Sequence, residues 1–228
     1  MAERIEDLQF EGLKIIQDPD GYLFTSDSVL LANYVRFLPK SKVVEFCAGS
    51  GVISILLSKK QKPSKIHAFE IMKAPFLLMQ KSVKLNNLED MVVPVNEDLK
   101  NASNLLGRGY ADVVVCNPPY IAKDNAVHQE ITVKNVAVNE LLVSFEEVVS
   151  SAEKLLKFGG KFFLVHRVDR LVDVFSVLRK YKIEPKKLNI IYPKEDFEPV
   201  VFLLEAHKGG KTGLRVEAKT LASKLNKA

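Results

Sequence analysis

A buried strand that runs directly into two consecutive prolines is the feature of this sequence that most limits its fold. The apolar run Val113–Cys116 is followed by Asn117-Pro118-Pro119-Tyr120. An uninterrupted run of small apolar residues is typical of a strand covered on both faces, as in a parallel sheet. Proline fixes φ and donates no backbone hydrogen bond, so the strand ends here, and the proline after Asn117 holds that residue extended. We therefore expect a stiff corner at the carboxyl end of a parallel strand.

The groups at this corner suit a flat base that carries an exocyclic amine. The side-chain oxygen of Asn117 and the backbone carbonyl of Pro118 can accept the two amino hydrogens, and the ring of Tyr120 can stack on the base. A plain proline turn that caps a strand is the simpler alternative. Proline makes up only about 5% of residues on average, so an Asn-Pro-Pro-aromatic run directly after a strand favours the binding site.

Strand-like and helix-like segments alternate along the 228 residues, which predicts a single α/β domain over residues 1–228. Strands separated by helices require a parallel sheet with right-handed crossovers. The expected strands cover residues 43–47, 66–69, 91–95, 113–116, 161–165, 188–192 and 200–205, and the expected helices cover residues 51–59, about 75–86, 141–158 and 168–178.

Three further segments complete the expected organisation. Residues 1–40 are expected to form a hairpin over residues 13–24, around the turn Asp18–Gly21, and then a helix that begins near Thr25 and that Pro39 stops. The irregular stretch 121–140 has the length of a lid or binding loop, with a short helix as the alternative. Residues 206–228 form a basic carboxyl-terminal tail.

Charge is distributed unevenly between this tail and the rest of the chain. From residue 206 onward there are six basic residues and one acidic residue, which accounts for the whole net charge of +5. Such a tail either favours a polyanion or is simply solvated, and composition leaves both open. We take Lys208, Lys211 and Arg215 as phosphate contacts.

Acidic residues end three successive expected strands and point to a nucleoside cofactor. Glu45 ends the first strand, Glu70 ends the second, and Asp98 follows the third. Since the carboxyl ends of parallel strands meet at one edge of a sheet, the three carboxylates should lie together, although each alone could be a solvated loop residue. Glu70 can bind ribose hydroxyls, Asp98 can accept from an adenine amine, and Glu45 suits an ammonium group. An adenosine that carries an amino acid fits this set, which predicts S-adenosylmethionine.

A glycine turn supports the same cofactor site. Gly49 and Gly51 follow the first core strand and open a helix, which permits a tight turn and a close approach of the backbone to a ligand. Ser54 stands where a dinucleotide-binding fingerprint has its third glycine, so the pattern is incomplete for a dinucleotide.

Other classes of site are not indicated. The two cysteines, Cys47 and Cys116, and the four histidines show no ligand spacing, so we expect neither a disulfide framework nor a metal site. No apolar run approaches the length of a membrane span, and the first residues lack the apolar core of a signal peptide. A cytoplasmic location is therefore the expectation.

The corner and the acidic strand ends resemble the Rossmann-like amino methyltransferases, whose signature is Asn/Asp-Pro-Pro-aromatic. The segments Gly21–Leu31 and Glu205–Arg215 further resemble the tRNA (adenine-N6)-methyltransferase family that acts on valine tRNA. The resemblance covers nearly the whole chain. It implies a mostly parallel seven-stranded sheet with helices on both faces and an antiparallel last strand. It also implies S-adenosylmethionine as cofactor, tRNA as partner, and methylation of the exocyclic amine of the adenine 3′ of the anticodon by a monomer or weak dimer.

The resemblance also assigns residues and leaves rival families open. The cofactor residues it implies are Thr25, Asp27, Glu45, Ala48, Gly49, Glu70 and Asp98, and the target-amine residues are Asn117, Pro118 and Tyr120. Release-factor glutamine methyltransferases share the corner but carry an amino-terminal helical domain for which residues 1–40 are too few. Guanine-amino rRNA methyltransferases share it in longer chains. A non-catalytic RNA-binding module on the same scaffold is the non-enzyme alternative, against which the intact Asn117 and Glu70 argue.

Overall fold

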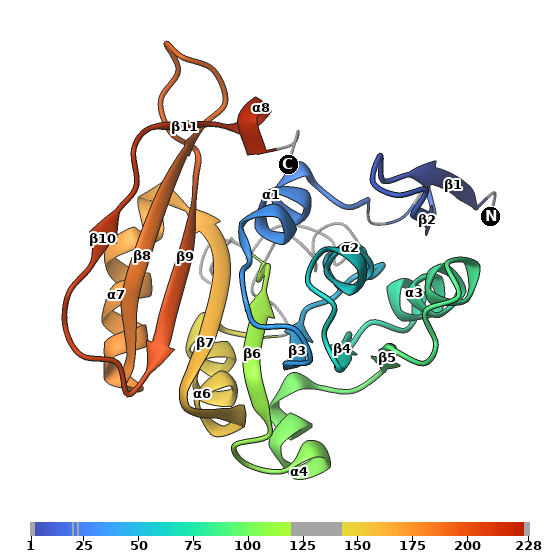
Figure 1. The fold of residues 1–228 in the computed structure, drawn as a ribbon, viewed down its shortest axis with the longest axis horizontal. Coiled ribbons are helices and arrows are strands. Elements are labelled where there is room, and N and C mark those ends of the chain that lie inside the picture. The colour runs from blue at the N-terminus through green and yellow to red at the C-terminus, as the bar shows by residue number, and fades with distance from the viewer. Residues whose placement is uncertain (1–2, 20, 22, 120–142, 226–228) are drawn as a thin grey trace, which may run out of the picture.

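A twisted, mainly parallel sheet forms the centre of the molecule (Figure 1). The computed structural model describes residues 3–19, 21, 23–119 and 143–225. Within these residues the strand order is β10-β8-β9-β7-β6-β3-β4-β5, and β11 also pairs with β8. The strands are β3 (Lys42–Phe46), β4 (Lys65–Phe69), β5 (Val92–Val95), β6 (Ala111–Cys116), β7 (Leu156–Arg167), β8 (Ile183–Tyr192), β9 (Val201–Lys208), β10 (Arg215–Val216) and β11 (Thr220–Leu221).

The last long strand, β9, runs antiparallel between β7 and β8, and the other pairings in this sheet are parallel. The predicted α/β class is therefore confirmed. The seven expected strands all form, and the two-residue strands β10 and β11 extend the sheet beyond β8.

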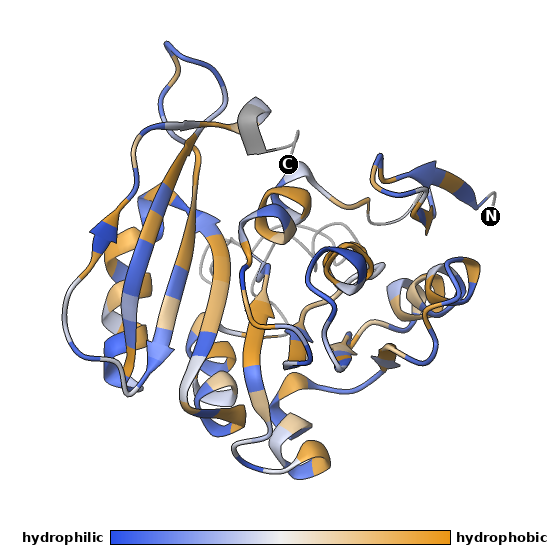
Figure 2. Cartoon of the chain, viewed as in Figure 1, coloured by the Kyte–Doolittle hydropathy of each residue, from blue (hydrophilic) through white to orange (hydrophobic). Residues whose placement is uncertain are grey.

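Helices cover both faces of the sheet, and the sheet separates the buried apolar side chains into two clusters. Along β6, Val113 and Val115 face one cluster of buried apolar side chains, whereas Val114 and Cys116 face the other. This alternation places a hydrophobic residue toward a covered face at every step, and Figure 2 shows β6 mostly in the hydrophobic colour. The first face is covered by α1 (Ser26–Tyr34), α2 (Val52–Lys60) and α3 (Lys73–Leu85), and the second by α4 (Ala102–Leu106), α6 (Phe145–Leu155) and α7 (Leu171–Lys180).

Short helical elements lie at the ends of the longer ones: η1 (Leu99–Asn101) precedes α4, η3 (Val168–Arg170) precedes α7, and α8 (Ala222–Leu225) follows β11. No helix in the described part of the chain is both long and apolar enough to cross a membrane.

The amino-terminal hairpin forms from different residues than the sequence suggests. Strand β2 (Lys14–Gln17) pairs antiparallel with β1 (Arg4–Asp7), so the hairpin expected over residues 13–24 is wrong. The turn itself exists, since the backbone N–H of Gly21 donates to the carbonyl of Asp18 over 3.0 Å. Beyond it, the backbone N–H of Phe24 donates to the side chain of Gln17 over 2.9 Å. This side-chain bond takes the place of a strand ladder, and the chain proceeds to α1.

Helix α6 is shorter than expected at its carboxyl end. The sequence predicts a helix over residues 141–158 that the pair Gly159-Gly160 ends, but α6 stops at Leu155 and β7 begins at Leu156. Leu156 has extended backbone angles (φ −66°, ψ 138°) and pairs with Ala111 on β6. A register shift between Ala111 and Val113 accommodates the residues before the regular part of β7. Sheet pairing thus ends the helix before the glycines do.

The carboxyl-terminal segment is not only a solvated tail. Residues 206–208 belong to β9, and β10 and β11 both pair with β8. The backbone N–H of Glu217 donates to the carbonyl of Leu188 over 2.8 Å, and α8 contacts α1. After β9 the chain therefore runs back along the outer edge of β8 toward α1 (Figure 1).

Candidate functional site

The carboxyl ends of three neighbouring strands bring the predicted residues to one edge of the sheet. Phe46 at the end of β3 lies opposite Phe69 of β4 on one side and Cys116 of β6 on the other. The glycine turn therefore starts beside Glu70 and beside Asn117, although these residues are far apart in the sequence. This edge is where ligands bind in open α/β sheets.

The turn after β3 needs left-handed backbone at several positions. Cys47 and Gly49 both have φ of 55°, and Gly51 has φ of 92°. A Cβ added to Gly51 would lie 2.8 Å from Cγ of Met79 in α3, so only glycine fits there. The backbone N–H of Ala48 donates to the carbonyl of Phe69 over 3.0 Å, which ties the turn to β4. The result is a tight loop that is fixed by these contacts and that leads directly into the first turn of α2.

Glu70 is the acid most closely joined to this turn. Its side chain is buried, and Oε2 accepts the backbone N–H of Gly49 over 2.7 Å. The other oxygen, Oε1, accepts the backbone N–H of Met72 over 2.9 Å. Burial raises the pKa of Glu70, whereas these backbone donors act in the opposite direction. The carboxylate therefore lies at the mouth of the glycine turn, where ribose hydroxyls would meet an acceptor.

Glu45 is more deeply enclosed than a ligand contact suggests. Its carboxylate accepts the backbone N–H of Ser54 over 2.9 Å and also the hydroxyl of Ser54, in the first turn of α2. Burial raises the pKa of Glu45 to about 8, because the loss of solvation outweighs the two bonds from Ser54, and Glu70 adds a smaller upward contribution. A nearby ammonium group would favour the charged form of the Glu45 carboxyl. The expected contact between Glu45 and the ammonium group of the cofactor remains a prediction. The sequence pattern gives Ser54 no role beyond standing in place of a third glycine, so its bonds to Glu45 are seen only in the structure.

Asp98 lies beyond the end of β5, which stops at Val95, and caps η1. Its Oδ1 accepts the backbone N–H of Lys100 over 2.9 Å, and its other oxygen forms an ion pair with Lys100 Nζ at 3.2 Å. The neighbouring Asn96 donates Nδ2 to the carbonyl of Glu70 over 2.8 Å. The ends of β4 and β5 are thus bonded to each other, which places Asp98 on the same edge as Glu70.

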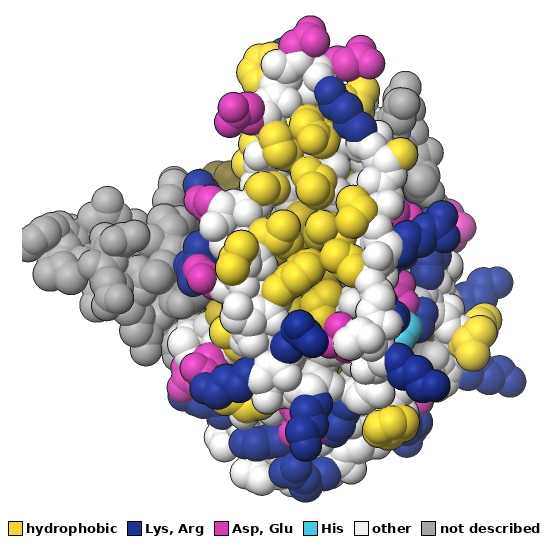
Figure 3. Space-filling view, turned by 90° about the vertical axis from the view of Figure 1, so that its left-hand side faces the viewer, with side chains coloured by type: hydrophobic (Ala, Val, Ile, Leu, Met, Phe, Trp, Pro, Cys, Tyr) yellow, Lys and Arg dark blue, Asp and Glu magenta, His cyan; other side chains and the backbone are white. Residues whose placement is uncertain are grey.

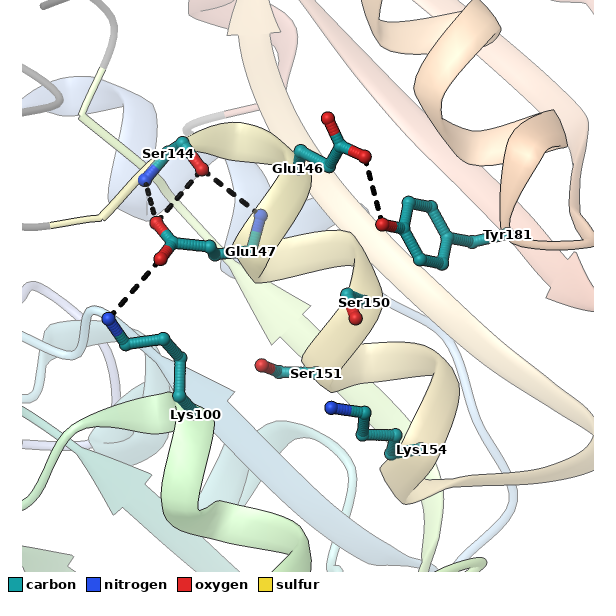
Figure 4. Close-up of a pocket in the computed structure, with 8 residues that line it drawn as sticks. All are labelled: Lys100, Ser144, Glu146, Glu147, Ser150, Ser151, Lys154 and Tyr181. Carbon is teal, nitrogen blue, oxygen red and sulfur yellow. Dashed lines mark hydrogen bonds and ion pairs between the residues drawn. The ribbon is translucent and has the colours of Figure 1, made fainter.

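An open pocket of about 500 Å³ lies beside Lys100, on the outer side of α6 (Figure 4). Lys100 joins Glu147 at 3.2 Å, and Glu147 in turn forms the capping box of α6 with Ser144. The lining mixes both signs of charge: Lys100, Ser144, Glu146, Glu147, Ser150, Ser151, Lys154 and Tyr181. With acids and lysines interleaved, this lining favours no single class of ligand.

The Asn117 corner is joined to the amino-terminal layer. Asn117 is half-buried and Pro118 is buried, and Asn117 Nδ2 donates to Ser28 Oγ over 3.0 Å. Ser28 belongs to the first turn of α1, close to the predicted cofactor residues Thr25, the exposed N-cap residue, and Asp27, which is half-buried. Tyr120 and the loop expected over residues 121–140 lie outside the described residues.

The predicted phosphate contacts are not brought to this corner. Lys208 ends β9 opposite Ile183, the first residue of β8, so it lies at the other edge of the sheet from Asn117. Its Nζ donates to the carbonyls of Glu153 and Leu156 and forms an ion pair with Glu153 at 2.9 Å. Lys211 and Arg215 lie after β9 in the return segment, residues 209–221, which runs back along β8, and both are exposed. Phosphate contacts of Lys208, Lys211 and Arg215 remain predictions. Figure 3, which shows the left-hand side of the molecule in Figure 1, has many Lys and Arg side chains toward its lower end.

The groups around the glycine turn fit S-adenosylmethionine. Within the turn, Ser50 Oγ is buried without a hydrogen-bond partner among the residues described. Carboxylates stand on both sides, at Glu45 and Glu70. A hydroxyl donor beside carboxylate acceptors suits a nucleoside that carries an amino acid. Across the described ranges, no three His, Cys, Asp or Glu side chains are arranged to hold a metal ion.

The family model and the relatives that match this chain are methyltransferases. A family model described as the TRM5/TYW2 methyltransferase domain matches residues 31–157. The chain is 24% identical over 161 residues to the tRNA1(Val) (adenine(37)-N6)-methyltransferase of Dyadobacter fermentans, covering 71% of this chain and 65% of that protein. It is 27% identical over 211 residues to the release factor glutamine methyltransferase of Clostridium acetobutylicum, covering 90% and 71%.

A solved structure shares the fold. The TYW2 protein of P. horikoshii in complex with MeSAdo aligns with a TM-score of 0.65 at 18% identity, covering 91% of this chain and 72% of that chain. The chain spans 65% of the length of the Dyadobacter enzyme and 52% of a release factor glutamine methyltransferase from Clostridium botulinum. The family model covers more than half of the chain, including the glycine turn, the acidic strand ends and the Asn117 corner. The chain therefore belongs to the TRM5/TYW2 methyltransferase domain family and has the fold of S-adenosylmethionine-dependent methyltransferases.

Proposed function

We propose that this protein transfers a methyl group from S-adenosylmethionine to the exocyclic amine of an adenine in tRNA, at the adenine 3′ of the anticodon of valine tRNA. One observation carries the proposal: the Asn117 corner and the glycine turn with Glu70 lie at the ends of neighbouring strands. A cofactor held at the turn thus lies next to an amine held at the corner. The name of the Dyadobacter relative supports the substrate.

The chain's own residues act on the amine by positioning and charge. When bound, S-adenosylmethionine supplies an electrophilic methyl group on a sulfonium. An aromatic amine is a poor nucleophile because its lone pair is delocalised into the ring. Hydrogen bonds from its two hydrogens to the Asn117 side-chain oxygen and the Pro118 carbonyl favour a localised lone pair and disperse the positive charge that develops. Tyr120 would hold the base in line, and the base must first leave its stack.

A second target fits the same corner. The release factor glutamine methyltransferase of Clostridium acetobutylicum aligns with 90% of the chain, and a glutamine side chain also presents an amide nitrogen with two hydrogens. The corner's two acceptors do not distinguish an adenine amine from this amide. The choice between them therefore rests on the substrate assay.

The test compares labelled methyl transfer to total tRNA, to rRNA and to a protein fraction that contains release factors. We expect incorporation into tRNA, with the modified nucleotide mapped in a deletion strain. Asn117→Ala should abolish most turnover while calorimetry shows retained cofactor binding, and the exposed Asn104→Ala is the matched control. Unchanged turnover in Asn117→Ala would contradict the assigned role. Incorporation into protein alone would replace tRNA by the second target.

A further inference from the structure

The chain's two cysteines lie beside the two halves of the site, although they are far apart in the sequence. Cys47 follows β3 and directly precedes the glycine turn, and Cys116 ends β6 directly before Asn117. Phe46 and Cys116 are register partners on these neighbouring parallel strands, so Cys47 lies one residue beyond the position opposite Cys116. The spacings of strands and residues put the two Cα atoms about 6 Å apart, within the range that a disulfide bond spans.

The backbone at Cys47 turns its thiol toward Cys116. Side chains alternate between the faces of a strand, so the residue after Phe46 in a continued strand would point away from Phe46 and Cys116. Cys47 instead has a left-handed φ of 55°, and its side chain packs against the same buried cluster that contains both of these residues. The two thiols are in contact: burial raises the pKa of the Cys116 thiol, and a hydrogen bond with the Cys47 thiol raises it further.

The two thiols differ in their access to solvent. Cys47 is half-buried, whereas Cys116 is fully buried. A solute as small as hydrogen peroxide therefore meets Cys47 first, and the sulfur that it oxidises already touches a second thiol. An accessible cysteine beside a second, resolving cysteine is the arrangement in which a sulfenic acid condenses to a reversible disulfide.

We propose that peroxide joins Cys47 and Cys116 in a reversible disulfide that weakens cofactor binding at the glycine turn. The Cys47 sulfur takes an oxygen atom from hydrogen peroxide and becomes a sulfenic acid, and one water is released. The Cys116 sulfur then attacks it: the S–S bond forms, the S–O bond breaks, and the hydroxyl leaves with the Cys116 proton as a second water. Two thiols are oxidised and one hydrogen peroxide is reduced to two waters, and a dithiol reverses the change.

The new bond acts on the turn against contacts that already hold it. An S–S bond of about 2.05 Å is shorter than any contact between separate thiols, so its formation draws Cys47 toward β6. The next two residues are held toward β4, Ala48 by its bond to the carbonyl of Phe69 and Gly49 by its bond to Glu70. Because β4 and β6 flank β3 on opposite sides, the pull on Cys47 opposes these bonds. This inference rests on the proposed function, since it concerns the same cofactor site.

The test measures S-adenosylmethionine binding by calorimetry before and after treatment with hydrogen peroxide, and follows the thiols by alkylation and mass spectrometry. We expect treated wild-type protein to stay monomeric, to lose both free thiols, and to yield a linked peptide pair about 2 Da lighter than the two reduced peptides. It should bind the cofactor about tenfold more weakly, the size expected for one lost hydrogen bond in the turn. Dithiothreitol should restore the affinity, which it does not do for oxidised methionine. Since the chain has two cysteines, a disulfide within one monomer joins Cys47 to Cys116.

Cys47→Ala and Cys47→Ser each remove only the accessible thiol, so they control for every other effect of peroxide. Both variants should bind the cofactor alike before and after treatment. The proposal is overturned by an equal loss of affinity in these variants, by thiols that remain unlinked in wild type, or by a disulfide that leaves the affinity unchanged. If oxidation lowers cofactor affinity as expected but the reduced enzyme methylates no tRNA, rRNA or protein fraction, the proposed function fails and the switch stands.

Discussion

Glu70 and Gly49 are joined by a hydrogen bond of 2.7 Å between the carboxylate of one and the backbone N–H of the other. The bond links the end of β4 to the turn after β3, so the acid expected at the ribose also braces the turn. Glu70 accepts a second backbone N–H, from Met72, over 2.9 Å. The carboxylate that holds the loop is therefore also the one predicted to meet the cofactor ribose.

Removing this carboxylate should affect both roles. Glu70→Ala leaves two backbone donors without their acceptor, so we expect a loss of about 1–3 kcal/mol in the free energy of unfolding. Cofactor affinity should fall at least tenfold, measured by calorimetry. Glu70→Gln keeps one acceptor oxygen and should lose less stability than Glu70→Ala. The exposed Glu89→Ala is the control, and wild-type affinity in Glu70→Ala would count against the ribose assignment.

The sequence predicts the strand ends well and the contacts between distant segments poorly. The buried run Val113–Cys116 and the prolines after it determine the corner locally, so the pattern was sufficient there. By contrast, strand β1 has the sequence Arg4-Ile5-Glu6-Asp7, and its one apolar side chain, Ile5, is 58% exposed. The strand therefore has no buried face from which it could be predicted. The end of α6 was missed because Leu155 and Leu156 are both buried, and their apolar pattern continues unbroken from helix into strand.

Contacts at the site were missed for a different reason. Ser54 binds Glu45 and Ser28 binds Asn117 through packing that no local pattern encodes. A polar run near the start of α1, which includes Ser28, was visible in the sequence, but its partner 89 residues away was not. Strand ends could thus be placed from the sequence, whereas the side chains that contact the functional groups needed the structure.

Protonation of Glu45 should make stability depend on pH in a defined window. The folded state raises the pKa of Glu45 from 4.5 to about 8, so the unfolded chain releases this proton first as pH rises. The contribution of Glu45 is therefore complete below about pH 4.5 and declines up to about pH 8, by an amount on the order of a few kcal/mol. The buried Glu70, whose pKa is also raised, acts in the same direction.

His166 acts in the opposite direction at the acidic end of this window. Burial lowers its pKa to about 4, so its contribution grows as pH rises toward 6.5. The test therefore compares urea unfolding of wild type and Glu45→Gln at each pH. The difference in the free energy of unfolding between the two proteins should move steadily in favour of Glu45→Gln between about pH 5 and pH 8. A constant difference would show that Glu45 does not titrate in this range.

Gly51 should tolerate no side chain, and the cost can be divided into its causes. Gly51→Ala places Cβ 2.8 Å from Cγ of Met79 and puts alanine at φ of 92°. Left-handed backbone costs about 1–2 kcal/mol for alanine, and overpacking adds about 1–3 kcal/mol. Gly109→Ala is the control, because its φ is 66° and nothing lies within 4 Å of the added Cβ, so only the backbone cost applies.

A second substitution isolates the steric part. Met79→Ala removes the clashing Cγ and Sδ, so the Gly51→Ala/Met79→Ala protein should be less destabilised than the sum of the single variants. Chemical denaturation of the four proteins gives this coupling. Simple additivity would mean that Met79 moves aside at no cost and that backbone strain alone requires glycine.

The return segment after β9 provides the test of RNA binding, and it has to be made by point substitution. Deletion from His207 onward would remove the end of β9 together with β10 and β11, so lost binding would then reflect a damaged sheet. Lys211→Glu with Arg215→Glu changes only exposed side chains. If both contact phosphates, tRNA affinity should fall and the slope of log affinity against log salt should decrease by about 2, or about 1 per contact.

The control must match the change in net charge. Lys59→Glu with Lys84→Glu makes the same change on exposed positions of α2 and α3, on the opposite part of the sheet. Long-range attraction depends on net charge, so the control should lower affinity slightly, whereas direct contacts appear only in the salt slope of the Lys211/Arg215 variant. Filter binding across a salt series measures both quantities. Equal slopes in the two double variants would show that Lys211 and Arg215 make no direct phosphate contacts and that this segment is solvated.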